Sequence, residues 1–254
     1  MRILRKLLLT LTVLLVIAGV VVATCPAGMA YRLVADRLGA FKLAGLSGSV
    51  WQGHAASMQV FGQDVGAIDW QLEAAPLLGG EVQARVRLAG TELQADGLFD
   101  RLSDGTLSVR DATFRVPARL AAPALDIPAL QLLGNIDGKL TEARLKGVWV
   151  QQASGSLHWN DAAVAGAAQA QLGTLEATFS SAPDGSISGV ARDLGGPLQL
   201  NGTFKVNAGS FDADANLASR DGNPQVIEAL RYIGEPQADG TSHLIIHGQL
   251  FKLF

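Results

Sequence analysis

Residues 81–88 read EVQARVRL, a stretch in which apolar and polar side chains alternate. Successive side chains of a β-strand point to opposite faces, so this alternation gathers the apolar side chains on one face. The apolar set is Val82, Ala84, Val86 and Leu88, and the polar set between them is Gln83, Arg85 and Arg87. The stretch therefore predicts a half-buried strand with one wet face.

Similar short segments follow one another along the rest of the chain, separated by turn-forming residues. Predicted strands at 106–110 and 242–251 each follow an Asp-Gly pair, and another at 198–206 contains an Asn-Gly pair. The chain has 29 Gly and only 6% aromatic residues, a mix that suits many short strands joined by tight turns. We therefore expect a mainly β protein with one large, curved, mostly antiparallel sheet.

The four tryptophans outline a weak internal repeat. The segments from Gly66 to Trp70 and from Gly155 to Trp159 share a Gly-x-hydrophobic-x-Trp pattern. Two related β modules, stacked into one continuous sheet, would explain this pattern. Recurrence of Gly and Trp by chance in a β-rich chain is the alternative.

A Pro- and Ala-rich stretch at 117–128 separates the two predicted modules, which cover residues 41–116 and 129–254. This stretch holds three of the nine prolines of the chain. Proline lacks the N–H that a strand ladder needs, so the stretch is expected to be an extended linker or an edge crossing.

Residues 1–24 are predicted to form a cytoplasmic stub and a transmembrane anchor. Residues 7–24 are uncharged, and as a helix they would span about 27 Å, close to the ~30 Å core of a bilayer. Arg2, Arg5 and Lys6 precede this run, and such a positive flank stays cytoplasmic. The chain is therefore expected to cross a bacterial inner membrane once, with its C-terminal part in the periplasm.

A cleaved signal peptide is the alternative for this run. Its apolar region would be ~7–15 residues and would end at an Ala-x-Ala-like site, for which residues 28–30 are the best candidate. The single cysteine, Cys25, excludes an intrachain disulfide. Lipidation of Cys25 is disfavoured because Thr24 stands where a lipidation signal has Gly, Ala or Ser.

Two short helices are predicted outside the membrane. Residues 25–40 form a juxtamembrane helix that either continues the anchor, caps the β domain or meets a partner helix; Pro26 suits its first turn. Residues 224–233 form a late helix with Asn223 as its cap. The apolar face of this late helix is expected to plug an open end of the sheet, with docking of another protein as the alternative.

Net charge disfavours two classes of partner. The formal net charge is −3, and removing the three basic residues before the apolar run leaves 17 Lys and Arg against 23 Asp and Glu, or −6. A mildly acidic body argues against a nucleic-acid phosphate partner. It also argues against a protein that lies on anionic lipid through its own surface charge.

The sequence offers little sign of catalysis or metal binding. His243 and His247 are four residues apart, but in a predicted strand they lie roughly 13 Å from each other and cannot share one ion. Asp212 and Asp214 resemble the start of a calcium loop, yet Leu217 stands where that loop needs Gly. No nucleophile elbow, phosphate loop or dinucleotide fingerprint is found, so we expect no enzyme and no cofactor.

Several motifs occur in an order typical of one family. They are Gly48–Gly53, Gly66–Trp70 with Pro76–Gly80, Asp193–Gly202, Leu230–Gly234 and Asp239-Gly240. In this order the chain resembles the type II secretion system protein N family (the GspN family). The resemblance implies a non-catalytic inner-membrane accessory subunit, with partners among the other inner-membrane secretion subunits and the outer-membrane secretin. The family offers no catalytic residues to carry over.

Seven positions are candidates for structural or interaction roles: Trp51, Trp70, Trp149, Trp159, Gly195, Gly196 and Pro197. The favoured hypothesis is a secretion subunit that acts through protein–protein contacts, with edge strands available for pairing with a partner strand. The alternative is an anchored periplasmic lipid-binding or lipid-transfer protein with an apolar groove. A continuous apolar groove on the concave face of the sheet would favour this second hypothesis.

Overall fold

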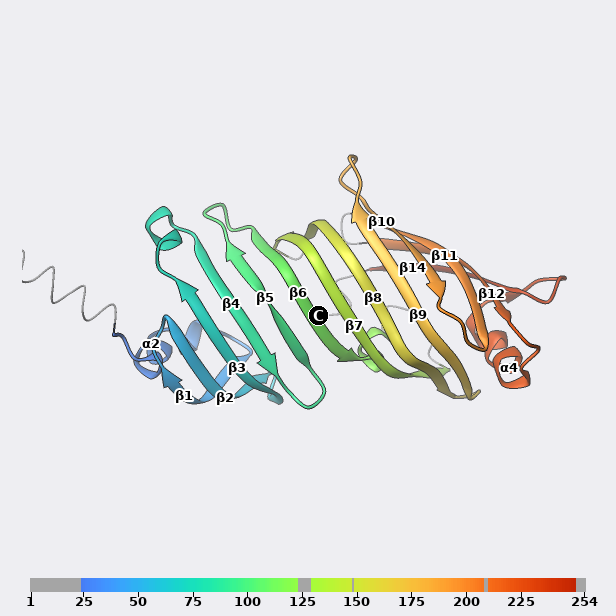
Figure 1. The fold of residues 1–254 in the computed structure, drawn as a ribbon, viewed down its shortest axis with the longest axis horizontal. Coiled ribbons are helices and arrows are strands. Elements are labelled where there is room, and N and C mark those ends of the chain that lie inside the picture. The colour runs from blue at the N-terminus through green and yellow to red at the C-terminus, as the bar shows by residue number, and fades with distance from the viewer. Residues whose placement is uncertain (1–23, 123–128, 148, 208–209, 250–254) are drawn as a thin grey trace, which may run out of the picture.

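The computed structural model describes residues 24–122, 129–147, 149–207 and 210–249. These residues form one antiparallel sheet of 14 strands together with two α-helices, as Figure 1 shows. The mainly β fold and the single large sheet are confirmed. All of the predicted anchor except Thr24 lies outside the described residues. Within the described ranges, no helix has the length and apolar character that crossing a membrane requires.

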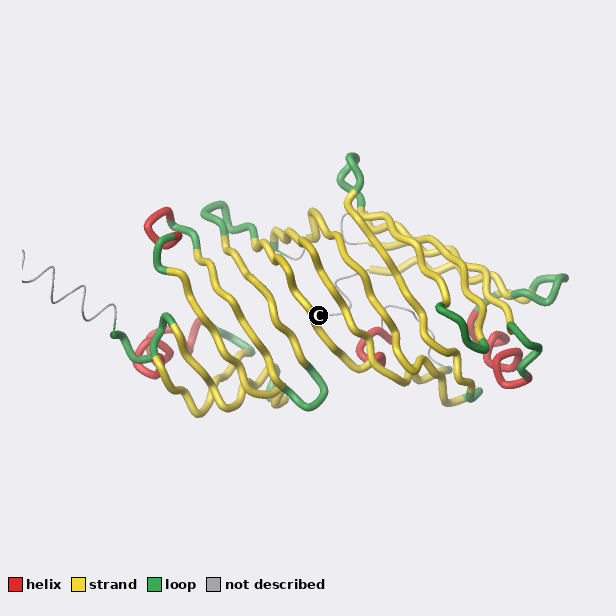
Figure 2. Tube along the Cα trace, viewed as in Figure 1, coloured by secondary structure: helices red, strands yellow, loops and turns green. Residues whose placement is uncertain are grey.

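The strands follow the chain in order across the sheet, and only the last two are exchanged. Figure 2 shows the strands in yellow as one continuous sheet, with the short helical segments in red at its margins. The strands are β1 (Phe41–Gly48), β2 (Gln52–Val60), β3 (Gln63–Glu73), β4 (Val82–Ala89), β5 (Gln94–Arg101), β6 (Leu107–Pro117), β7 (Leu130–Lys146), β8 (Trp149–Gly166), β9 (Ala170–Ser181), β10 (Ile187–Asp193), β11 (Leu198–Asn207), β12 (Ser210–Ser219), β13 (Glu235–Pro236) and β14 (Ser242–Gln249). The helices are α2 (Ala27–Val34) and α4 (Pro224–Ile233), and the 3-10 turns are η1 (Ala35–Arg37), η2 (Pro76–Gly79) and η3 (Ala118–Ala121).

The register keeps one face of the sheet apolar from edge to edge. Directly paired residues form an unbroken row across β1–β12 and β14, which we call the apolar row. Its members are Leu46, Ala55, Ile68, Leu88, Ala95, Phe114, Gly138, Leu157, Ala177, Ala191, Gly202, Ala215 and Leu244. Because strand side chains alternate between faces, the strand predicted from residues 81–88 enters this row through Leu88.

The next row along the strands belongs to the opposite, polar face. It runs through His54, Asp69, Arg87, Asp96, Thr113, Lys139, Ser156, Thr178, Val190, Thr203, Asp214 and Ile245. Most of these side chains are charged or hydroxylated, as expected for a sheet with one solvated face. The sheet is therefore two-faced along its whole length.

The main core lies where the apolar face curls over itself in the C-terminal half. Helix α4 contacts β9, β12 and β14, although β9 and β12 are not adjacent strands. Its inner residues Val226 and Leu230 are buried in the same cluster as Leu198 and Leu217. The late helix is thus confirmed over its predicted residues, and its apolar face plugs one end of the sheet, as expected.

Asn223 begins α4 in the way that its side chain predicts. Its side-chain oxygen accepts hydrogen bonds from the backbone N–H groups of Gln225 and Val226. These contacts satisfy two donors that would otherwise have no intrahelical partner. Pro224 occupies the first turn, where a missing N–H costs nothing.

The two predicted modules share one sheet, because β6 pairs with β7 from Leu107 opposite Leu145 to Pro117 opposite Asn135. The predicted linker begins with η3, whose Ala118 is buried in the main core, and residues 123–128 lie outside the described residues. A division of the chain into two related modules stays a prediction.

Candidate functional site

An apolar cavity of about 320 Å³ lies in the C-terminal half of the described residues. Strands β7–β12 and β14 form its walls, and η3 and α4 contribute Ala118, Ala121 and Ile233. The remaining wall side chains are Leu130, Leu132, Ile136, Leu157, Trp159, Val164, Leu172, Leu175, Ala177, Ala191, Leu198, Leu200, Leu217, Leu244 and Ile246, with Glu176 as the one charged residue. This volume falls in the range of about 300–1,000 Å³ that small-molecule sites occupy.

The apolar row has small side chains where it borders the cavity, at Ala177 and Ala191. Ala177 of β9 lies directly opposite Ala191 of β10, and the row continues through Gly202 and Ala215. Larger side chains at Leu157 and in the neighbouring strands surround these small residues. These small side chains leave room beside the larger ones that line the rest of the cavity.

Glu176 does not change the apolar character of this wall. In the register it lies opposite His158 and Arg192, so its side chain belongs to the polar face. There its carboxylate accepts hydrogen bonds from Arg192 and lies 3.2 Å from the His158 Nε2 atom. The hydrogen bond from Arg192 holds the pKa of Glu176 below its usual value.

Trp70 of β3 and Trp159 of β8 have equivalent hydrogen bonds from their indole N–H groups. The Nε1–H group of Trp159 donates to the Leu133 carbonyl at 2.8 Å, and that of Trp70 donates to the Val50 carbonyl at 2.9 Å. Trp159 lines the cavity. Trp70 instead covers Gly53, where a Cβ atom would lie 2.2 Å from the Trp70 ring. A buried indole normally needs such a partner for its N–H.

The other two tryptophans lie at strand beginnings. Trp51 immediately precedes β2 and is half-buried, and its carbonyl accepts a hydrogen bond from the Leu72 N–H group at 2.7 Å. Trp149 begins β8 opposite Lys146 and is 47% exposed. The structure therefore disperses the four tryptophans over both halves of the sheet instead of bringing them together.

Gly195, Gly196 and Pro197 form the turn that joins β10 to β11. Gly196 has a φ of 143°, and a Cβ atom there would lie 3.0 Å from the Cα atom of Gly173. The Pro197 carbonyl accepts from the Arg220 N–H group, and the Gly196 carbonyl accepts from Arg220 Nε. These contacts give the three residues a structural role in packing the turn. A contact with a partner at these positions, or at the tryptophans, stays a prediction.

Asp193 organises this turn from its polar side. Its carboxylate accepts from the N–H groups of Gly195 and Leu200 and pairs with Arg220. Burial by itself would raise the pKa of Asp193, but the two backbone donors and the charge of Arg220 outweigh it and lower the pKa. Asp193 therefore stays ionised and acts as a clamp for the turn.

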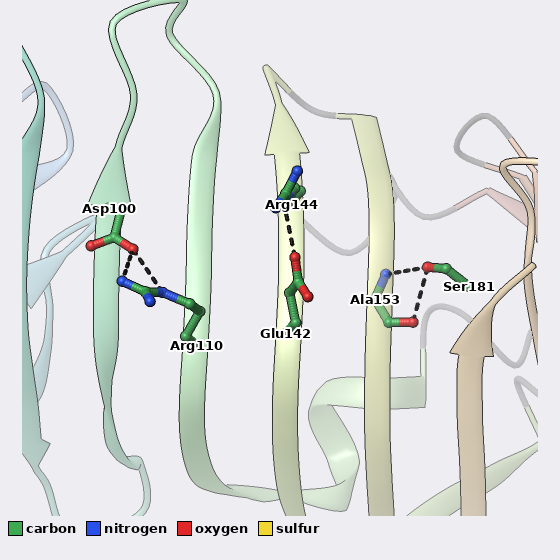
Figure 3. A network of polar contacts seen from close by, with 6 residues as sticks. All are labelled: Asp100, Arg110, Glu142, Arg144, Ala153 and Ser181. Carbon is green, nitrogen blue, oxygen red and sulfur yellow. Dashed lines mark hydrogen bonds and ion pairs between the residues drawn. The ribbon is translucent and has the colours of Figure 1, made fainter.

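A polar network near the middle of the sheet contains Asp100, which is buried (Figure 3). Arg110 donates from Nε and Nη2 to the Asp100 Oδ2 atom at 2.9 and 2.6 Å. Among the described residues, the buried Oδ1 atom of Asp100 has no hydrogen-bond partner. Farther along, Glu142 pairs with Arg144, and Ser181 exchanges hydrogen bonds with the Ala153 backbone. A single paired carboxylate supplies no nucleophile and base couple.

The histidines singled out in the sequence lie on the polar face, each beside an aspartate. His243 Nε2 lies 3.0 Å from Asp214 Oδ1, and His247 Nδ1 lies 2.6 Å from Asp212 Oδ1. The two acids are thus strand-face residues, as predicted. Nowhere in the described ranges do three or more His, Cys, Asp or Glu side chains gather as a metal site.

The sequence predicted an apolar groove only as part of the alternative hypothesis. It did not predict which residues line the cavity. The signal in the sequence is the run of small residues at inward positions of four consecutive strands, which includes Ala177 and Ala191. Alternation alone does not distinguish an inward alanine that fills a tight contact from one that borders a void. That distinction depends on the curl of the sheet, which brings β9 close to α4.

The fold and the cavity define the class of the protein: a one-sheet β protein with one apolar face, which contains the cavity, and a mostly polar opposite face. A family-wide sequence comparison matches residues 40–244 to the family described as "Type II secretion system (T2SS), protein N". The chain belongs to this family, which confirms the resemblance and associates the chain with type II secretion.

A relative in Vibrio cholerae serotype O1 (strain ATCC 39315 / El Tor Inaba N16961), named Type II secretion system protein N, is 31% identical over 143 residues. The matched region covers 54% of this chain and 56% of the relative. The chain thus spans about half the length of that curated relative. No solved structure matches the chain.

Proposed function

We propose that this protein is a non-catalytic inner-membrane accessory subunit of the type II secretion system. In this role it crosses the membrane once, holds its sheet in the periplasm and supports the export of folded proteins through protein–protein contacts. Its partners are the other inner-membrane subunits and, at the far end, the outer-membrane secretin. The family match over residues 40–244 is the observation that carries the proposal.

The outer edge of β14 is the surface that we assign to a partner strand. Gln237 donates its N–H group to the Thr241 carbonyl, and Glu235 lies opposite His243. Backbone groups in an antiparallel strand alternate between its two neighbours, so those of Ile245 and His247 also point away from β12. The strands of the described residues pair with this side of β14 only at Ser242 and His243. Free edge groups of this kind accept an added strand.

The opposite edge of the sheet is already occupied by the chain itself. Along β1, the Phe41 N–H group donates to the Leu38 carbonyl, and the Leu43 N–H group donates to the Tyr31 hydroxyl at 3.1 Å. Past the end of β1, Pro26 bridges to Ser49. The comparison of the two edges favours β14 over β1 for strand addition.

Deletion of the gene tests the secretion role directly. We expect reduced export of type II substrates and reduced recovery of the inner-membrane complex, with both restored by the full chain. Unchanged export together with unchanged complex recovery would contradict the proposal. A periplasm-active reporter fused after the last residue tests the topology, and activity of a cytoplasm-active reporter at the same position would contradict it.

Substitution at the edge tests the surface. Ile245→Pro removes one outward N–H group and leaves the pairing with β12 intact, because proline is tolerated on edge strands where its nitrogen faces solvent. A photo-crosslinking residue at His247, whose side chain is 75% exposed, should capture an inner-membrane secretion subunit. We expect Ile245→Pro to abolish this crosslink and the matched control Ile245→Ala to retain it. Equal crosslinking in both variants would rule out strand addition at β14.

A further inference from the structure

We propose that the cavity between the curled C-terminal strands and α4 binds a single unbranched hydrocarbon chain, supplied by a phospholipid or by a free fatty acid. This inference goes beyond the secretion role and does not depend on it. The ligand class follows from three properties of the site: the chemistry of its wall, its volume and its continuity with the apolar row.

The described residues of the wall offer nothing to a polar ligand. Its side chains are aliphatic or aromatic, and the indole N–H of Trp159 is already donated to the Leu133 carbonyl. The carboxylate of Glu176 is engaged with Arg192 on the other face of the sheet. A polar group moved from water into such a site loses its hydrogen bonds without replacement, which costs binding affinity.

The volume fits one narrow hydrocarbon chain. A cavity of about 320 Å³ lies at the small end of the range of about 300–1,000 Å³ for ligand sites. Ordered water needs two to four polar partners, and the wall residues that the structure describes have none to give. A hydrocarbon chain satisfies the wall by dispersion contacts and by removal of its own surface from water.

The apolar row continues this surface outside the cavity. From Ala177 the row passes through directly paired residues to Leu46 of β1, at the edge that follows the predicted anchor. Adjacent strands are about 4.8 Å apart, so this part of the row, from β9 to β1, extends over roughly 40 Å. A hydrocarbon chain longer than the cavity therefore meets further apolar surface where it leaves the curled region.

The direct test is photolabelling of the full chain in bacterial membranes. One arm uses palmitic acid with a diazirine on its chain, and the other uses phosphatidylethanolamine and phosphatidylglycerol vesicles with a diazirine on one acyl chain. We expect labelled peptides that contain Leu200 or Leu217. Labelling in the first arm only assigns a free fatty acid, and labelling in the second assigns a phospholipid. Absence of labelling in both arms, or labelling confined to polar-face residues, would overturn the proposal.

A pair of substitutions on one strand separates the cavity from the surface. Ala191→Phe places a ring in the cavity, whereas Val190→Phe, on the polar face of the same strand, does not. We expect the first to reduce labelling about tenfold or more, equivalent to the loss of about two buried methylenes, and the second to leave it unchanged. Equal reduction by both variants would refute a site in the cavity.

Competition with unlabelled fatty acids keeps the test valid if Ala191→Phe does not fold. Each added methylene that the cavity buries should strengthen competition about fourfold, until the cavity is filled. Competition that does not depend on chain length would contradict a hydrocarbon site.

Discussion

Strands β1–β5 and strands β7–β14 have the same two-faced pattern but bury their apolar face to very different degrees. In the described strands β1–β5, Ala55 is the one buried residue with an apolar side chain. Trp70, Val86 and Leu88 on the same face are only half-buried. In β7–β14 the corresponding face contains the main core, closed by α4 and η3.

This difference shows that alternation sets the faces of a sheet, while burial depends on what covers them. A sheet with one apolar face needs another layer to remove that face from water. The C-terminal half supplies the layer itself through its curl and α4. The N-terminal half relies on local contacts such as Trp70 over Gly53.

The largest effect on stability should come from removing a buried side chain in β7–β14, whose apolar face is covered by α4 and η3. Leu217→Ala, at a side chain only 2% exposed, should lower the free energy of unfolding by about 3 kcal/mol. Leu88→Ala at a half-buried position of β4 should cost about 1 kcal/mol, because less apolar surface is lost. Urea unfolding of both variants measures the difference. Equal losses would mean that the face of β1–β5 is as well covered as that of β7–β14.

The next largest effect on stability should come from the close contact between Gly53 and Trp70 in β1–β5. Gly53→Ala would place a Cβ atom 2.2 Å from the Trp70 ring and 2.7 Å from the Ser49 carbonyl oxygen. We expect a loss of about 1–3 kcal/mol in the free energy of unfolding. Gly79→Ala is the matched control, since nothing lies within 4 Å of its Cβ position. A neutral Gly53→Ala would show that β2 and β3 move apart at little cost.

A smaller effect is expected at the start of the covering helix. Asn223→Ala removes the side-chain acceptor for the Gln225 and Val226 N–H groups and should cost about 1 kcal/mol. Asn223→Asp keeps an acceptor and should be nearly neutral. Urea unfolding of both variants measures the loss of stability. Hydrogen exchange of the α4 amides in the same variants checks whether the helix is the first part to open. Equal stability of the two variants would contradict a capping role.

The smallest effect should appear on the polar face, which both halves share. Arg115 donates to Asp137 at 2.5 and 2.8 Å, and this hydrogen bonding lowers the pKa of Asp137. A folded-state pKa below the unfolded value of about 3.9 means that the stabilisation is complete above that pH and is lost as pH falls. Since Asp137 is one-third exposed, the contribution should stay below about 1 kcal/mol.

Urea unfolding at pH 7 and pH 3 measures this contribution. Asp137→Asn should reduce the difference in stability between the two pH values, and Arg115→Gln should reduce it by a similar amount. A pH dependence unchanged in both variants would show that the pair contributes nothing.

The sequence was sufficient for the features that depend on local pattern. The alternation at 81–88, the Asp-Gly turns and the Asn223–Pro224 helix start are encoded in neighbouring residues, and all appear as predicted. The family was also recognisable from the order of short motifs.

The cavity could not be derived in the same way, because it depends on long-range geometry. Ala177 and Ala191 border a void only because the sheet curls far enough for α4 to contact β9. The strand order across the sheet, including the exchange of β13 and β14, likewise depends on pairings between separate segments. The separate roles of the tryptophans followed from their packing partners, and nothing in the Gly-x-hydrophobic-x-Trp pattern distinguishes Trp70 from Trp159.

The strand order has a consequence for how this protein is made. From β2 to β12 every strand pairs with the strand just before it in the chain, so each new strand can add to a sheet that already exists. Pairing between close neighbours in sequence needs little loop closure and favours fast folding. A chain that enters a compartment N-terminus first can therefore build its sheet as it arrives. Only the last step, the docking of α4 and β14, must wait for the C-terminal residues.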